Sequence, residues 1–169
     1  MKLKIRLNSD SAEKALAQVR EYEKSLESKT ERLRQRVAEE IQKLAETGFN
    51  GSVYDDILME GTRVPNVKVV TEEKGKVSVV IAYGKEAVFA EFGAGVYYNP
   101  GGSPHPLQPP GIVEIGTYGK GYGARKVWGF LENGELRLTH GTPASMPMYR
   151  ALQEVSARLE EIAREVFSQ

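Results

Sequence analysis

Three side chains with acid–base or metal-binding chemistry lie in the middle and late parts of the chain. Glu91 is the carboxylate inside an apolar run, and His105 and His140 are the two histidines of the sequence. Brought together beneath a loop, they could form the site of a small enzyme or ligand-binding domain, marked by a pocket and a perturbed pKa. A zinc site made of these three residues is less favoured, because the histidines show no metal-ligand spacing such as H-E-x-x-H.

The same residues also suit a purely structural role. A general acid needs a second titrating partner, and none is visible beside Glu91 in the sequence. A carboxylate that accepts hydrogen bonds from loop N–H groups, or pairs with an arginine, would instead hold a glycine turn in place. We favour this interpretation and expect no enzyme activity, catalytic residue, cofactor or metal. The residues predicted to build the turn are Glu91, Gly93, Gly95, His140, Gly141 and Pro147.

Composition and motifs argue against several other classes of protein. Lys plus Arg and Asp plus Glu both number 23, so the net charge is zero and a nucleic-acid-binding protein is disfavoured. The basic residues Lys120, Arg125 and Lys126 are the only hint of such a module, which would bind with strong salt dependence. The glycines of 119–124 imitate a dinucleotide fingerprint, but the residues that follow predict a strand where that motif needs a helix. There is no cysteine, no apolar run that could span a membrane, and no secretion signal at the start.

Around these residues the patterns predict a single α+β domain over 1–169, with a small antiparallel sheet packed by an N-terminal helical region and a long C-terminal helix. Residues 3–7 alternate as a strand, and 10–47 follow a helical stripe that lapses at 28–30, so one bent helix and two helices are both open. Gly48 is predicted to be a left-handed C-cap. Strands are expected at 67–71 and 77–82, the second buried on both faces, whereas 86–92 could be helix or strand.

Later turns and helix signals complete this outline. Asn133-Gly134 predicts a hairpin between strands at 126–131 and 135–139. Ser145 is predicted to be the N-cap of an unbroken closing helix, with Pro147 in its first turn. A short helical piece is expected at 54–59.

The segment 94–125 is an extended variable loop rich in Gly, Pro and Tyr. A structureless loop of this length inside a compact domain is usually functional or disordered. Tyrosine is enriched at interfaces because it has both an apolar ring and a polar end. We therefore predict that this segment is a docking arm that becomes ordered on assembly. The predicted protein-contact residues are Phe92, Tyr97, Tyr98, Tyr118 and Tyr122.

Three stretches in a fixed order give the chain a family likeness. They are the F-A-E-F-G-A-G run at 89–95, the T-H-G-T-P-A run at 139–144 and the P-M-Y-R-A-L run at 147–152. In these stretches, and in the order of its elements, the chain resembles the small neck, head–tail joining or tail-completion proteins of long-tailed bacteriophages and prophages. The family often has Thr where this chain has Ala94, and an aromatic residue where it has Met148.

The resemblance implies a structural protein of the virion neck or tail. It implies a homo-oligomeric ring, commonly six-fold, that contacts other neck, connector and tail proteins and lets DNA pass through its channel without specific binding. It further implies assembly in the host cytoplasm and a final location in the virion. The small enzyme or ligand-binding domain with Glu91, His105 and His140 remains the alternative.

Overall fold

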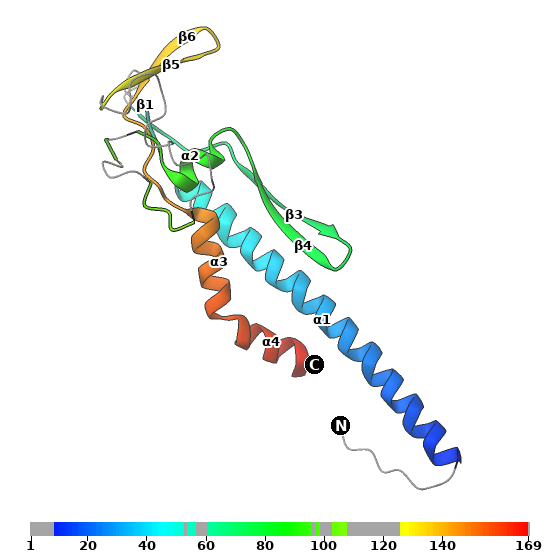
Figure 1. Ribbon diagram of the computed structural model, residues 1–169. Coiled ribbons are helices and arrows are strands. Elements are labelled where there is room, and N and C mark those ends of the chain that lie inside the picture. The colour runs from blue at the N-terminus through cyan, green and yellow to red at the C-terminus, as the bar shows by residue number, and fades with distance from the viewer. Residues whose placement is uncertain are drawn as a thin grey trace.

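The computed structural model describes residues 9–52, 54–56, 61–95, 97–98, 103–107 and 126–168. Within them the chain is an α+β protein, as the sequence predicts. A long helix forms the axis of the molecule, two shorter helices run back along part of it, and paired strands flank its end (Figure 1). The predicted strand at 3–7 lies outside the described residues. No helix of the described chain is long and apolar enough to cross a membrane.

The axis is helix α1, Ser9–Gly51, which is one continuous helix of 43 residues. This settles the choice between one helix and two, because the polar residues at 28–30 continue the backbone hydrogen bonding although they interrupt the apolar stripe. The C-cap prediction for Gly48 is wrong, since the helix continues past it to Gly51. The glycine serves packing instead: a Cβ atom at Gly48 would lie 2.8 Å from the Cβ of Pro147.

Replacing Gly48 with alanine is therefore expected to destabilise the protein although alanine is the better helix former. The overpacked contact with Pro147 should cost about 1–3 kcal/mol, more than the gain of roughly 1 kcal/mol in helix propensity. Urea unfolding measures the difference. Gly51→Ala is the matched control, because no atom lies within 4 Å of its added Cβ. Equal stability of the two variants would contradict this packing role.

The strands form three separate antiparallel pairs rather than one sheet in the described part of the chain. The middle pair, β3 (Lys68–Lys74) with β4 (Val77–Tyr83), matches the two strands predicted at 67–71 and 77–82 and lies against α1. It is not buried on both faces as predicted, because a two-stranded ribbon covers α1 with one face only. The last pair, β5 (Trp128–Glu132) with β6 (Glu135–Thr139), turns at Asn133-Gly134 as predicted, both with positive φ.

The first pair corrects another prediction. Tyr54–Asp56 is strand β1, not a helical piece, and it pairs with β2, Gly61–Arg63. A three-residue strand is too short to leave a period-2 pattern in the sequence.

A polar clamp fixes the β3–β4 ribbon on α1. The Arg34 guanidinium bonds Glu73 and Ser78 on the ribbon and Glu31 on its own helix. The Ser78 hydroxyl and Arg34 together lower the pKa of the Glu73 carboxyl. Thr71 adds a hydrogen bond of 2.8 Å to Gln42. The ribbon thus has a defined position although most of its outer surface faces water.

The closing helix is interrupted, which corrects the prediction of a single unbroken one. Helix α3, Pro147–Ala157, is followed by α4, Leu159–Ser168, with Arg158 between them at φ −102° and ψ 3°. The buried residues Ala151, Val155, Ile162 and Val166 continue one stripe across the break. The bend therefore keeps the same face of both helices against α1.

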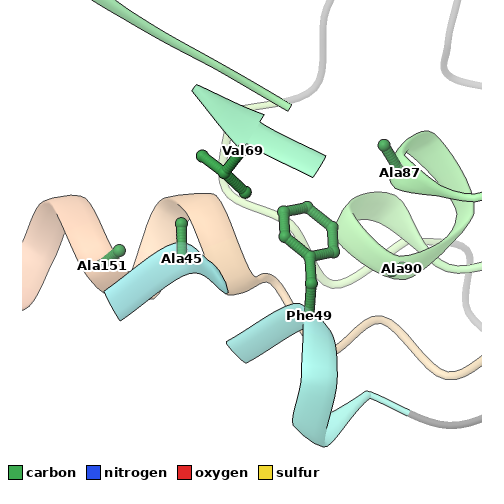
Figure 2. Packing of buried hydrophobic residues seen from close by; sticks show 6 residues of the cluster. All are labelled: Ala45, Phe49, Val69, Ala87, Ala90 and Ala151. Atoms are coloured by element: carbon green, nitrogen blue, oxygen red, sulfur yellow. The ribbon is translucent and has the colours of Figure 1, made fainter. Parts of the chain in front are cut away.

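The core lies where α1, α2 (Ala87–Phe92), α3 and β3 meet. Phe49 is almost fully buried, with Val69 of β3 and the alanines of α2 beside its ring (Figure 2). Ala45 and Ala151 lie between α1 and α3, and small side chains there let the two helices approach closely. This core fixes α2 against the start of α3, which positions the site described next.

Candidate functional site

Three segments of the described chain meet at one place, called the junction below. They are α2 with residues 93–95, the loop at 139–146, and the first turn of α3. Ala94 and Thr142 pair as an antiparallel bridge, and each N–H lies 2.8 Å from the other residue's carbonyl oxygen. The Ala90 carbonyl accepts hydrogen bonds from the Ser145 and Met146 N–H groups. The two motif stretches that lie nearly fifty residues apart in sequence are thus joined directly.

Glycines allow the segments to approach this closely. Gly93 and Gly95 adopt φ of 79° and 78°, which turns the chain sharply after α2. Gly141 has φ 102°, and a Cβ there would lie far inside van der Waals contact of the Ala94 carbonyl group, 2.7 Å from its carbon. Both conditions exclude a side chain at Gly141 without a shift of the backbone.

The Glu91 carboxylate caps the first turn of α3. Its Oε2 accepts a hydrogen bond of 2.8 Å from the Met148 N–H, and its Oε1 accepts one of 2.9 Å from the Tyr149 N–H. These N–H groups lie in the first turn of the helix, where backbone N–H groups have no acceptor within the helix. The start of a helix also carries a partial positive charge. Glu91 is buried, and a buried charge is costly unless hydrogen-bond donors compensate it. The two N–H groups are such donors.

His105 is a further hydrogen-bond partner of this carboxylate. Its Nε2 lies 3.0 Å from Glu91 Oε1, and its Nδ1 accepts a hydrogen bond of 3.0 Å from the Leu107 N–H. Because Nδ1 is an acceptor, the neutral ring carries its proton on Nε2 and donates it to Glu91. The ring lies between Phe92 and Tyr149, with centroid distances of 4.5 and 5.1 Å. His105 therefore fastens the segment 103–107 onto the junction.

His105→Ala should release that segment while the helix cap stays in place. The Leu107 N–H loses its acceptor, so its hydrogen exchange should become at least about tenfold faster, whereas the Met148 and Tyr149 N–H groups keep Glu91. Stability should fall by about 2 kcal/mol. Hydrogen exchange followed by NMR resolves the three amides. Uniform loss of protection at all of them would contradict the separate roles.

The other predicted contact residues lie close by. His140 stacks on Tyr97 with ring centroids 4.4 Å apart, and Tyr97 meets Tyr98 edge to face at 4.9 Å. Tyr97 and Tyr98 are exposed, whereas Phe92 is half-buried against His105. Tyr118 and Tyr122, and the basic residues Lys120 and Arg125, lie outside the described residues.

The structure joins two of the three residues that the enzyme alternative requires. Glu91 and His105 are in direct contact, and His140 has Tyr97 as its ring partner. Over the described ranges no group of three His, Cys, Asp or Glu side chains could hold a metal ion. The carboxylate oxygens of Glu91 and both ring nitrogens of His105 make hydrogen bonds within the chain.

Two features of the junction are missed by sequence reasoning. Ser145 is not the N-cap of α3; Met146 takes that place in a left-handed conformation, φ 53°, without a side-chain cap. The Ser145 hydroxyl bonds the Ala90 carbonyl instead and lies 2.6 Å from the hydroxyl of Ser52, at the end of α1. Pro147 is in the first turn, as predicted. The S-x-P spacing signals a helix start, but only the fold reveals that Glu91 supplies the cap.

Comparison of the chain with models of known protein families, with curated proteins and with solved structures finds no match.

Proposed function

We propose that the protein is a structural subunit of a bacteriophage neck or tail that acts in head–tail joining or tail completion. The motif stretches behind the family likeness are the segments that meet at the junction, where Ala94 pairs with Thr142 and Glu91 caps α3. Motif residues that stabilise the fold, and do not bind a substrate, are consistent with a structural protein that acts through protein–protein contacts. This proposal places the protein in the virion after assembly in the host cytoplasm.

The observation that carries the proposal is that the described part of the chain leaves many large apolar side chains exposed, among them Val77 at 57% and Leu131 at 74%. Among the described residues, seven of the twelve buried hydrophobic residues are alanines, so this part of the chain encloses a small core. A chain with such a surface and such a core gains stability when it buries apolar area against other subunits.

Apolar side chains on that surface indicate where such contacts form. Leu131 and Leu136 lie opposite each other on the β5–β6 hairpin, and both are exposed. Leu152 of α3 and Leu159 of α4 are also exposed. Exposed apolar patches of this kind mark protein–protein contact sites. In the proposed assembly they contact neighbouring copies in a ring, six-fold as the resemblance implies, and other neck, connector and tail proteins.

The zero net charge suits a ring through which DNA moves. A strongly basic channel would bind the phosphate backbone and slow the passage of DNA. In the proposed neck, DNA passes without specific binding. The alternative of an enzyme or ligand-binding domain is less well supported, because Glu91 and His105 bond to the chain itself.

Negative-stain electron microscopy of the concentrated protein tests the proposal. We expect closed rings with an open centre, and we expect Leu131→Glu with Leu136→Glu to prevent them. Lys126→Glu, an exposed residue before β5, is the control for a change of charge alone. The proposal fails if no ring forms with the purified protein or with added neck and tail proteins.

A further inference from the structure

The two hydrogen bonds of the buried His105 imidazole place different demands on its protonation. The Leu107 N–H lies 3.0 Å from Nδ1, and a backbone N–H can only donate, so Nδ1 must be free of a proton. Nε2 lies 3.0 Å from the Glu91 carboxylate, which accepts from an N–H. The bond to Leu107 therefore requires a neutral imidazole. The bond to Glu91 is kept when the imidazole is protonated and then becomes charge-assisted.

The charged and titratable groups that face this imidazole come from two helices. Helix α2 contributes the Glu91 carboxylate, the group within salt-bridge distance of Nε2. Helix α3 contributes the Tyr149 ring, 5.1 Å away between centroids, and the partial positive charge of its first turn. Arg150, the next residue of α3, is exposed to water. A protonated imidazole thus keeps a negatively charged partner at this buried position.

Protonation of the imidazole is incompatible with the bond to Leu107. With a proton on each nitrogen, Nδ1–H and the Leu107 N–H would be two donors 3.0 Å apart, and neither could accept. The side chain of Leu107 is 63% exposed, so apolar packing contributes little to holding its backbone in place. On the other side of the histidine, the His105 N–H donates to the Ser103 hydroxyl at 3.2 Å, and this bond does not involve the imidazole. The turn from His105 to Leu107 is therefore the part that has to open.

We propose that His105 is a pH-dependent fastening of the chain at the junction. The neutral imidazole holds the backbone of Leu107, and the protonated imidazole stays on Glu91 and releases it. Leu107 precedes residues 108–125, so this bond fixes the point from which the chain continues into them. Histidine is the side chain whose charge ordinarily changes near neutral pH, which suits such a switch. The proposal does not depend on a role in a virion, because all of its groups belong to one chain.

NMR spectroscopy of the intact protein between about pH 8 and about pH 5 tests the proposal. The carbon-bound protons of the His105 imidazole report its protonation. Hydrogen exchange, corrected for its own dependence on pH, reports the state of the backbone amides. We expect the protection of the Leu107 N–H to fall at least about tenfold, with the same midpoint as the His105 imidazole. The Met148 and Tyr149 N–H groups should stay protected, because Glu91 continues to accept from them.

The two histidines of the chain provide a matched pair of variants. His105→Gln should abolish the transition at Leu107, because the amide that replaces the imidazole does not titrate. His140→Gln should leave the transition unchanged, because the ring partner of His140 is Tyr97. The titration of the unmodified protein is decisive even if the His105 variant does not fold.

The proposal is overturned if the His105 imidazole titrates and the Leu107 N–H keeps its protection. It is also overturned if the imidazole stays neutral down to the pH at which the protein unfolds. Loss of protection at Met148 and Tyr149 together with Leu107 would overturn it as well, because the proton would then be taken up by Glu91.

Discussion

Glu91→Ala is expected to lower the free energy of unfolding by about 4 kcal/mol. The substitution removes the acceptor of the Met148 and Tyr149 N–H groups and of His105, all at a buried position. Hydrogen bonds to a charged group contribute about 1.5–3 kcal/mol each, and the buried donors left behind add a desolvation cost. The negative charge at the start of α3 is lost as well. Urea or thermal unfolding at neutral pH measures the effect.

Two further variants show where this effect comes from. Glu91→Gln keeps one acceptor oxygen but not the charge, so it should cost roughly half as much. Glu86→Ala is the control. Glu86 is the half-buried residue just before α2, the helix that carries Glu91, and its side chain makes no cap hydrogen bond. Its loss should change the free energy of unfolding by less than about 0.5 kcal/mol. A loss below about 1 kcal/mol for Glu91→Ala would contradict the capping role.

Gly141→Ala is the second substitution with a large expected effect, at least about 4 kcal/mol. A non-glycine residue at this φ is strained by about 1–2 kcal/mol, and its Cβ would collide with the carbonyl group of Ala94. To relieve the collision the Ala94–Thr142 bridge must open, which separates the two sides of the junction. Circular dichroism during unfolding measures stability, and hydrogen exchange at the Thr142 N–H reports on the bridge.

Gly75→Ala is the control that separates the cost of backbone strain at positive φ from the cost of a steric collision. Gly75 also has positive φ, 62°, but no atom lies within 4 Å of an added Cβ. It should cost only about 1 kcal/mol. If both glycine variants lose the same stability, close approach at Gly141 is not important and the junction is looser than described.

The sequence predicts those elements whose cause is local. The apolar stripe of α1 and the Asn133-Gly134 turn depend on residues a few positions apart, so periodicity and turn chemistry identify them. The pattern at 86–92 fits helix and strand equally, because the six residues of α2 are too few to show a period. The short pair β1–β2 leaves no signal in the sequence for the same reason.

Features that depend on distant segments could not be predicted. Gly48 has the position of a C-cap in sequence, but its role is set by Pro147, which only the fold brings to it. The apolar surroundings of Glu91 indicate a structural carboxylate, yet its donors come from a helix more than fifty residues later. The bend at Arg158 leaves the stripe intact and therefore leaves no signal in the apolar pattern.

The native mass of the purified protein across a wide range of concentrations tests the proposed self-assembly most directly. Light scattering coupled to size-exclusion chromatography measures it without assumptions about shape. The proposal predicts a closed multiple of 18.7 kDa, six copies in the arrangement that the resemblance implies. A chain that stays at 18.7 kDa at every concentration would contradict self-assembly through the surfaces described above.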